Sequence, residues 1–305
     1  DIYTTKARLL ESYPEYSELL PLKTKVEFTP YSLSGWVKTE IGIGEDVRTA
    51  ALSFSSSGIP FSITDVAAYI PPSPKQVDLG FGKFISSSNC EEVEILFLDA
   101  ATQFRYQVKR KTTGNFNDSI KIAVCPWELP QWPEEAKFVF RDINYFWAAT
   151  NFIKNAFKDI FPNEKIFHAP PAVHIDEIHL EEFDVRLIEG EFVFLTVFDG
   201  LSSISRKNPI ASIRAFQRAF VRGENVKLVV KTMNFNNNSD ELNELAQLIR
   251  SDGRIELVNE KLTKSDLFKL VKSCHSFISL HRSEGFGRNI AEAMLFKRPV
   301  IVSAF

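Results

Sequence analysis

Short apolar runs alternate with helical periods along the carboxyl-terminal half of this 305-residue chain. The run from Phe192 to Phe198 is almost continuously apolar, which is typical of a strand covered on both faces. Asn208 and Pro209 then predict the start of a helix, with Asn as its cap and Pro at its first position. The same step recurs three more times, with expected strands at 226–230, 255–258 and 275–280. Such repeated βα units predict a parallel, doubly wound sheet, which binds ligands beyond the carboxyl ends of its strands.

Composition indicates a globular protein of two domains. The chain is 44% hydrophobic and 25% charged, and its length allows two ordinary domains. We expect an amino-terminal Rossmann-like domain over residues 1–175, a linker over 176–190, where acidic residues accumulate, and a carboxyl-terminal Rossmann-like domain over 191–305. The chain lacks an initial methionine and stops soon after a strand-like run at 300–302, so we expect both ends to be cut short.

Charge and cysteine usage exclude several classes of partner. The net charge of −3 gives no bulk attraction to nucleic acid, so any phosphate site must be local. Three widely spaced cysteines and five histidines without a metal-binding spacing predict neither a disulfide framework nor a metal site. The sequence also has no apolar run long enough to cross a bilayer and no signal peptide at its start. A cytoplasmic location is therefore expected.

The strand at 275–280 leads into the most informative loop of the chain. Glu284 follows the strand, Gly285-Phe286-Gly287 is expected to form a turn, and Glu292 falls on the next helix. Glycines let a ligand approach the main chain, and the first N–H groups of a helix attract phosphate. A carboxylate accepts hydrogen bonds from neighbouring hydroxyls of a sugar. The alternative is a solvated turn with two surface carboxylates.

This stretch resembles the E-x7-E motif of retaining glycosyltransferases of family 4 (group 1), which have the GT-B fold. The resemblance implies two Rossmann-like domains whose parallel sheets face a central cleft. It also implies that Glu284 binds hydroxyls of the donor sugar, that the main chain of Gly285, Phe286 and Gly287 meets the sugar and phosphates, and that Glu292 holds the ribose.

A second loop at the same sheet edge ends in Arg206 and Lys207. It resembles the phosphate loop of the family, in which an early arginine and a late lysine bind the leaving diphosphate. Lys207 matches the lysine, whereas Leu201 or Ser202 occupies the place of the arginine. In that case Arg206 or Lys231 supplies the second positive charge for the diphosphate. The alternative is that Arg206 and Lys207 simply form a basic surface turn.

In the amino-terminal half, Gly42-Ile43-Gly44 stands between a strand-like run and a helical period. It lacks the further glycine of a dinucleotide fingerprint, which disfavours a dehydrogenase. It resembles the first loop of the family, which contacts the donor phosphates and faces the acceptor. Glu45 and Arg48 belong either to that site or to an ion pair within the helix.

Trp127 and Glu128 lie in a segment rich in tryptophan and proline. An aromatic ring beside a carboxylate is a common sugar platform, so an acceptor site is one interpretation. The other is that Trp127 and Trp132 fill the core.

Together these features predict a metal- and cofactor-independent glycosyltransferase that moves a sugar from a nucleoside diphosphate sugar to a hydroxyl of a glycan, lipid-linked or protein-linked acceptor. The resemblance also implies a role in polysaccharide synthesis and peripheral contact with the inner membrane surface. One alternative is a GT-B protein that binds sugar or nucleotide without catalysis. Another is a phosphorylase- or epimerase-like enzyme, which the absence of a pyridoxal phosphate lysine motif disfavours.

Overall fold

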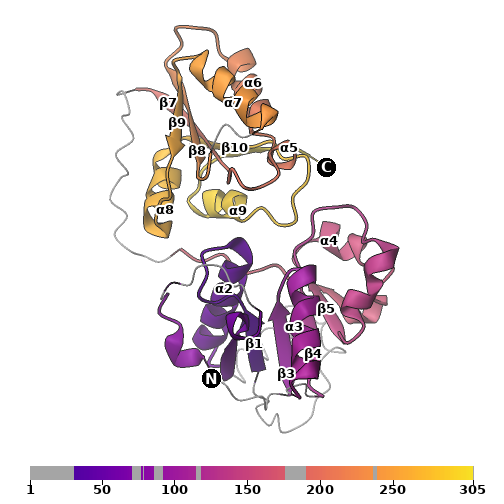
Figure 1. Ribbon diagram of the computed structural model, residues 1–305. Helices are drawn as coiled ribbons and strands as arrows, with labels where there is room; N and C mark the ends of the chain where they lie inside the picture. Colours follow the sequence, from indigo (N-terminus) through magenta and orange to yellow (C-terminus); the bar gives the residue numbers. More distant parts are fainter. Residues whose placement is uncertain are drawn as a thin grey trace, which may run out of the picture.

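The computed structural model describes residues 31–70, 77, 79–85, 92–114, 118–175, 190–235 and 239–304. Within these ranges the chain forms two α/β domains, each built on one parallel sheet (Figure 1). This confirms the predicted fold class. Apart from Gly190, the expected linker lies outside the described residues, so its boundaries stay a prediction.

The amino-terminal sheet has six strands in the order β2-β1-β3-β4-β5-β6. Its strands and α-helices are β1 (Tyr31–Gly35), α2 (Gly42–Ser56), β2 (Phe61–Asp65), β3 (Val93–Phe97), α3 (Ala100–Thr112), β4 (Ile120–Val124), β5 (Tyr145–Ala148), α4 (Asn151–Ala156) and β6 (Ile166–His168). Short 3-10 turns are η2 (Val66–Ala68), η3 (Gly82–Phe84), η4 (Glu134–Phe140) and η5 (Asn163–Lys165).

The carboxyl-terminal sheet has five strands in the order β11-β10-β7-β8-β9. Its elements are β7 (Phe192–Val197), α5 (Ile204–Lys207), α6 (Pro209–Ala219), β8 (Val226–Thr232), α7 (Asp240–Arg250), β9 (Ile255–Asn259), α8 (Lys264–Ser273), β10 (Ser276–Ser279), α9 (Arg288–Leu295) and β11 (Val300–Val302). The three further βα steps expected from the sequence are all present.

Alternation along the strands explains why both faces of this sheet are covered. Phe194 and Leu228 pack with the buried residues of α6 and α7 on one face, whereas Leu195 and Val229 pack with those of α8 and α9 on the other. Successive residues of a strand point to opposite faces, so a continuous apolar run supplies two cores at once.

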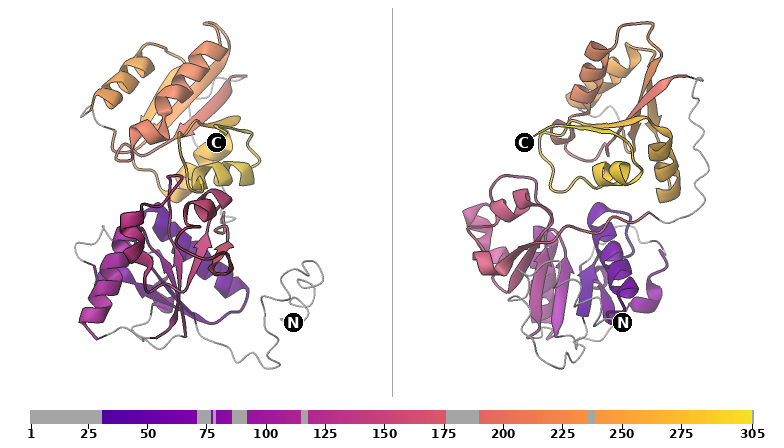
Figure 2. Two further views of the ribbon diagram at one scale, coloured as in Figure 1. Left: turned by 90° about the vertical axis from the view of Figure 1, so that its right-hand side faces the viewer. Right: turned by 180° about the vertical axis from the view of Figure 1, so that it is seen from behind.

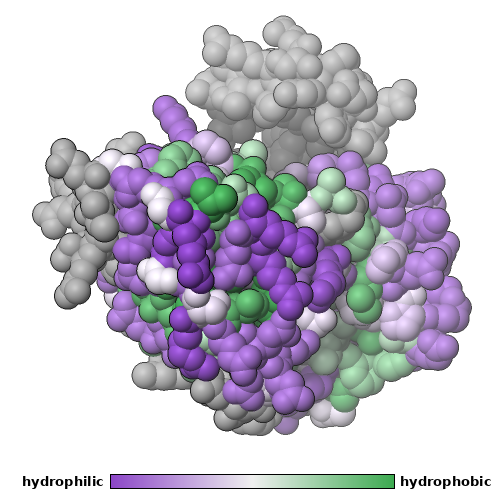
Figure 3. All heavy atoms as spheres, turned by 90° about the horizontal axis from the view of Figure 1, so that it is seen from above, coloured by the Kyte–Doolittle hydropathy of each residue, from purple (hydrophilic) through white to green (hydrophobic). Residues whose placement is uncertain are grey.

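The two domains meet through the loops that follow their strands. Figure 1 and both views of Figure 2 show α9, in yellow, between the carboxyl-terminal sheet and the amino-terminal domain, with α2 below it. In Figure 3, hydrophilic residues dominate the visible face and hydrophobic ones form smaller groups among them. Among the described residues, no helix has the length and apolar character needed to cross a membrane.

Candidate active site

Glu284 and Glu292 lie where the sequence predicts them. Strand β10 ends at Ser279, Glu284 stands in the following loop, and Glu292 is on α9. Gly287 caps this helix in the left-handed conformation, with φ of 77°. A residue with a side chain is strained there, which explains the second glycine of the turn. Both glutamates have little solvent contact, because the side chain of Glu284 is 18% exposed and the whole of Glu292 is 6% exposed.

Two cations from the end of α5 converge on Glu284. The ammonium Nζ of Lys207 lies 2.6 Å from Oε2 of Glu284, and a guanidinium nitrogen of Arg206 lies 3.5 Å from the same oxygen. Arg206 also donates to the main-chain oxygen of Ser283 over 3.3 Å. The predicted phosphate loop and the glutamate loop are thus brought together.

The residue after Lys207 ties these two loops to each other. Asn208 is the N-cap residue of α6, as expected, but it adopts a left-handed conformation and its side chain makes no capping bond. Its amide Nδ2 instead donates to the main-chain oxygen of Leu280 over 2.9 Å, just beyond β10. The expected cap position and the expected proline at the start of the helix are therefore confirmed, but a contact distant in sequence takes the side chain of Asn208 in place of a capping bond.

His281 completes the surroundings of Glu284. Its Nε2 atom lies 3.1 Å from Oε2 of Glu284, and its Nδ1 atom contacts the hydroxyl of Ser279. Burial, together with the nearby charge of Lys207, lowers the pKa of His281 to about 4. Burial opposes the ionisation of Glu284, but the charge and hydrogen bond of Lys207 outweigh it and lower the pKa of that carboxyl. A neutral imidazole and an ionised carboxylate therefore share this site at neutral pH.

Glu292 has different electrostatic surroundings. Burial raises its pKa to about 7, with partial compensation from the charges of Arg288 and Lys264. Glu45, on the amino-terminal domain, raises the pKa further. The second glutamate of the motif thus faces the junction between the domains rather than the Lys207 group.

Lys231 is engaged elsewhere. Its ammonium donates to the main-chain oxygens of Thr232 and Glu260, each over 2.6 Å, and the residue is 4% exposed. Burial lowers the pKa of this ammonium. Because two carbonyl groups already occupy Lys231, Arg206 is the better placed of the two predicted substitutes for the missing arginine.

Gly42, Ile43 and Gly44 form the first turn of α2 rather than the loop before it. A Cβ atom on Gly44 would come within 2.6 Å of the main-chain oxygen of Trp36, whereas one on Gly42 would meet nothing within 4 Å. Gly44 is thus required for the close approach of the helix to the preceding loop, a packing role that the sequence did not reveal.

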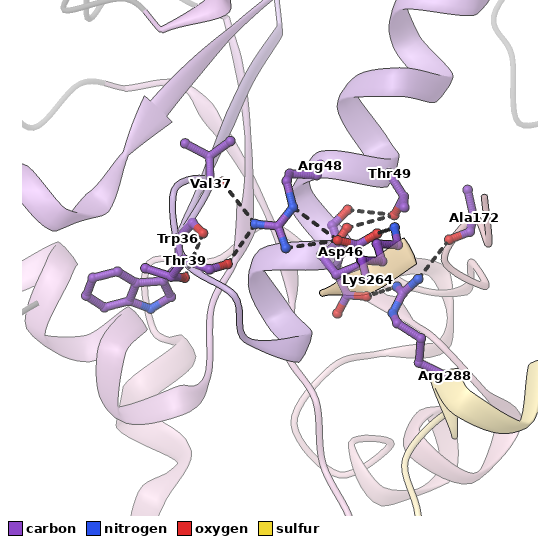
Figure 4. A network of polar contacts seen from close by, with 10 residues as sticks. Trp36, Val37, Thr39, Asp46, Arg48, Thr49, Ala172, Lys264 and Arg288 are labelled. Atoms are coloured by element: carbon purple, nitrogen blue, oxygen red, sulfur yellow. Dashed lines mark hydrogen bonds and ion pairs between the residues drawn. The ribbon is translucent and has the colours of Figure 1, made fainter. Parts of the chain in front are cut away.

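The residues that follow Gly44 hold this loop and reach the other domain (Figure 4). Arg48 pairs with Glu45 over 2.9 Å and donates to the main-chain oxygens of Val37 and Thr39. The helix ion pair is therefore the interpretation that holds for Arg48. Glu45 also pairs with Lys264 of α8, and Asp46 pairs with Arg288 of α9.

The segment with Trp127 and Glu128 also reaches the glutamate loop. Trp132 is buried in the core, and Trp127 packs on it with ring centroids 4.5 Å apart. Glu128 lies 3.8 Å from Arg206, and its main-chain oxygen accepts from the hydroxyl of Ser283. The core interpretation thus holds for Trp132, whereas Glu128 stands next to the basic loop.

A tight main-chain contact fixes the same junction. Thr150 donates its hydroxyl to the main-chain oxygen of Gly285 over 2.9 Å. A Cβ atom on Gly285 would lie 2.9 Å from the main-chain oxygen of Trp127. The first glycine of the turn is therefore needed for contact between the domains.

The sequence analysis did not identify two functional candidates, Arg288 and His281. Only Arg288 has a sequence context that could have indicated its role. A cation such as Arg288 at the first position of a helix opposes the helix dipole, which indicates an acidic partner nearby. That partner is Asp46. His281 gave no such signal, because its spacing from Glu284 in a loop has no regular meaning. Among the described residues, no group of three or more His, Cys, Asp and Glu side chains could hold a metal ion.

Comparison with known proteins is consistent with this geometry. Residues 186–305 match the family described as glycosyl transferases group 1. This segment includes Lys207, Glu284 and Glu292. Comparison of the sequence with curated proteins gives no match.

Solved structures with a similar fold cover 90% of the chain. The apo form of the lipopolysaccharide outer core galactosyltransferase WaaB has a TM-score of 0.59 and 13% identity, covering 90% of this chain and 80% of its own. HepE of Anabaena, solved with UDP-glucose, has a TM-score of 0.58, 14% identity and the same coverage. A UDP-forming trehalose-phosphate synthase from Burkholderia xenovorans has a TM-score of 0.58 and 10% identity, covering 90% of this chain and 83% of its own. The fold of the chain is GT-B.

Proposed function

We propose that the chain is a retaining glycosyltransferase that moves a sugar from a nucleoside diphosphate sugar to an acceptor hydroxyl. The observation that carries the proposal is the convergence of Lys207 and Arg206 on Glu284, in the segment that matches group 1 glycosyltransferases. The complex of HepE with UDP-glucose supports a UDP-sugar as the donor. We further propose a carbohydrate or lipid-linked acceptor and peripheral action at a membrane.

In this proposal, different residues bind different parts of the donor. Glu284 accepts hydrogen bonds from the sugar hydroxyls, and Glu292 accepts them from the ribose. Lys207 and Arg206 move from Glu284 to the diphosphate, which carries more negative charge than a carboxylate. The turn from Gly285 to Gly287 donates main-chain N–H groups to the same diphosphate. Gly42, Ile43 and Gly44 face the phosphates from α2.

The reaction breaks the bond between the anomeric carbon and the diphosphate oxygen, which keeps the electron pair. The acceptor oxygen bonds to the same face of the sugar, and its proton passes to the departing phosphate. Lys207 and Arg206 stabilise the charge that develops there. We propose that Glu128, 3.8 Å from Arg206, orients the acceptor.

Turnover with a panel of nucleotide sugars and acceptors tests the proposal. We expect the wild-type protein to release nucleoside diphosphate and to form a product with retained anomeric configuration, which nuclear magnetic resonance reads directly. Glu284→Ala should abolish both, whereas Glu241→Ala, an exposed position on α7, should leave them unchanged. An inverted product would contradict the retaining mechanism.

A second candidate is a GT-B protein that binds nucleotide or sugar without catalysis. The observation that favours it is Leu201, 76% exposed in the neighbourhood where the family carries its early arginine. Tight binding of a nucleotide sugar without turnover across the acceptor panel would support this candidate.

A further inference from the structure

We propose that His281 is a positioning residue for Glu284, donating its Nε2–H to the carboxylate and keeping it aligned for the donor sugar when Lys207 moves to the diphosphate. This inference rests on the proposed function. It concerns a side chain that lies three positions before the first glutamate of the motif and is 9% exposed.

The hydrogen-bond partners of Glu284 differ in how firmly the structure holds them in place. Oε1 accepts from the main-chain nitrogen of Gly285 over 3.2 Å. Oε2 receives Lys207 over 2.6 Å and His281 over 3.1 Å, and a guanidinium nitrogen of Arg206 lies 3.5 Å from it. Lys207 and Arg206 are long, flexible side chains at the end of α5, whereas the ring of His281 is held between Glu284 and Ser279.

The position of the proton on His281 follows from its neighbours. The groups that face the ring are Lys207 and Arg206 from α5, Glu284 from its own loop and Ser279 from β10. Burial and the Lys207 charge keep the pKa of the imidazole low, so the neutral ring carries one proton. A carboxylate only accepts hydrogen bonds, which places that proton on Nε2. The hydroxyl of Ser279 then donates to Nδ1, and Ser279, His281 and Glu284 form a chain of donors that points at the carboxylate.

The hydrogen bonds from Ser279 to His281 and from His281 to Glu284 have their largest effect once a donor is bound. When Lys207 and Arg206 turn toward a diphosphate, they leave Oε2 of a mostly buried carboxylate, and an unpaired buried charge is costly. The imidazole then remains as the side-chain partner that fixes the direction of Glu284. Because a well-directed carboxylate is what selects sugar hydroxyls, loss of His281 should affect recognition of the sugar more than that of the nucleotide.

Binding of UDP-glucose and of UDP, each measured by titration calorimetry, tests this role. Gln places an N–H donor where Nε2 of the histidine lies, whereas Asn reaches only the Nδ1 position. We expect His281→Asn to weaken UDP-glucose about tenfold or more, as for loss of a hydrogen bond to a charged group, and to leave UDP unchanged. His281→Gln should recover most of the affinity. In the turnover assay, the asparagine variant should raise KM for the donor and lower kcat.

Equal affinities of both variants and the wild type for UDP-glucose would overturn the proposal, and so would equal losses for UDP and UDP-glucose. If the wild type binds neither ligand, the proposed donor fails, and a second measurement decides the inference by itself. Long-range ¹H–¹⁵N spectra of the histidine rings in the free protein should show His281 with its proton on Nε2. Glu284→Gln should shift that signal. A proton on Nδ1, or a signal that ignores Glu284→Gln, would contradict the proposed contact.

Discussion

At the scale of residues, the two glutamates of the motif show how surroundings set the chemistry of one side chain. Glu284 is paired with Lys207, so its pKa is lowered, whereas burial, which the charges of Arg288 and Lys264 offset only in part, raises the pKa of Glu292 to about 7. The sequence could predict both positions, because strand, turn and helix signals are local. It could not predict the contrast, which depends on side chains brought together by the fold.

Glu292 should therefore make stability depend on pH in a specific direction. Its raised pKa means that the native state holds the proton more tightly than the unfolded chain does, so the free energy of unfolding falls as pH rises from about 4.5 toward 7. We expect Glu292→Gln to be more stable than the wild type at pH 8, by about 1–3 kcal/mol, and nearly equal to it at pH 5. Urea unfolding at the two pH values measures this.

Glu284→Gln is the matched control and should behave in the opposite way. A lowered carboxyl pKa contributes stability above the unfolded value, which is lost as pH falls through the folded value. The glutamine variant should thus be less stable than the wild type at pH 8, and the difference should shrink in acid. A change of the same sign in both variants would refute the assignment of the two environments.

At the scale of elements, the structure explains why α2 begins with two glycines that have different roles. A Cβ on Gly44 would meet main-chain oxygens of Trp36 and Thr39 at 2.6 and 2.7 Å, whereas Gly42 has open space and no left-handed backbone. The sequence predicted the helix and its glycines but assigned them to a loop. The sequence alone could not separate the roles of the two glycines, because only Gly44 lies in close contact with the preceding turn.

Substitution of each glycine by alanine separates packing from flexibility. Gly44→Ala should destabilise the protein by about 1–3 kcal/mol, because the loop before α2 must shift. Gly42→Ala should be neutral or stabilising by up to about 1 kcal/mol, since it restricts the unfolded chain without a clash. Thermal unfolding of the two variants gives the comparison, and equal losses would show that the close approach at Gly44 is not what requires glycine.

At the scale of the whole molecule, an acidic strip on the amino-terminal domain meets a basic strip on the carboxyl-terminal one. Its pairs are Glu40 with Lys261, Glu45 with Lys264, and Asp46 with Arg288. Asp46 and Arg288 are 242 positions apart. The sequence could predict two domains from local patterns, but pairs this distant carry no local signal.

These pairs should hold the two domains together. We expect Arg288→Gln to increase the radius of gyration in X-ray scattering. High salt should have a smaller effect on the wild type, because it screens the exposed pair of Glu40 and Lys261 more than the largely buried pair of Asp46 and Arg288. Lys111→Gln serves as the control, since Lys111 pairs with Asp142 inside one domain. An identical radius for the Arg288→Gln and wild-type proteins at low salt would show that the strip does not set the spacing of the domains.

The central claim is that the glutamate loop is the donor site, with Glu284 on the sugar and Glu292 on the ribose. Its most direct test is calorimetric titration of UDP-glucose and UDP into the wild type, Glu284→Ala and Glu292→Ala. We predict that Glu284→Ala loses the preference for UDP-glucose over UDP, whereas Glu292→Ala weakens both ligands. Wild-type affinities for both ligands in both variants would contradict the claim.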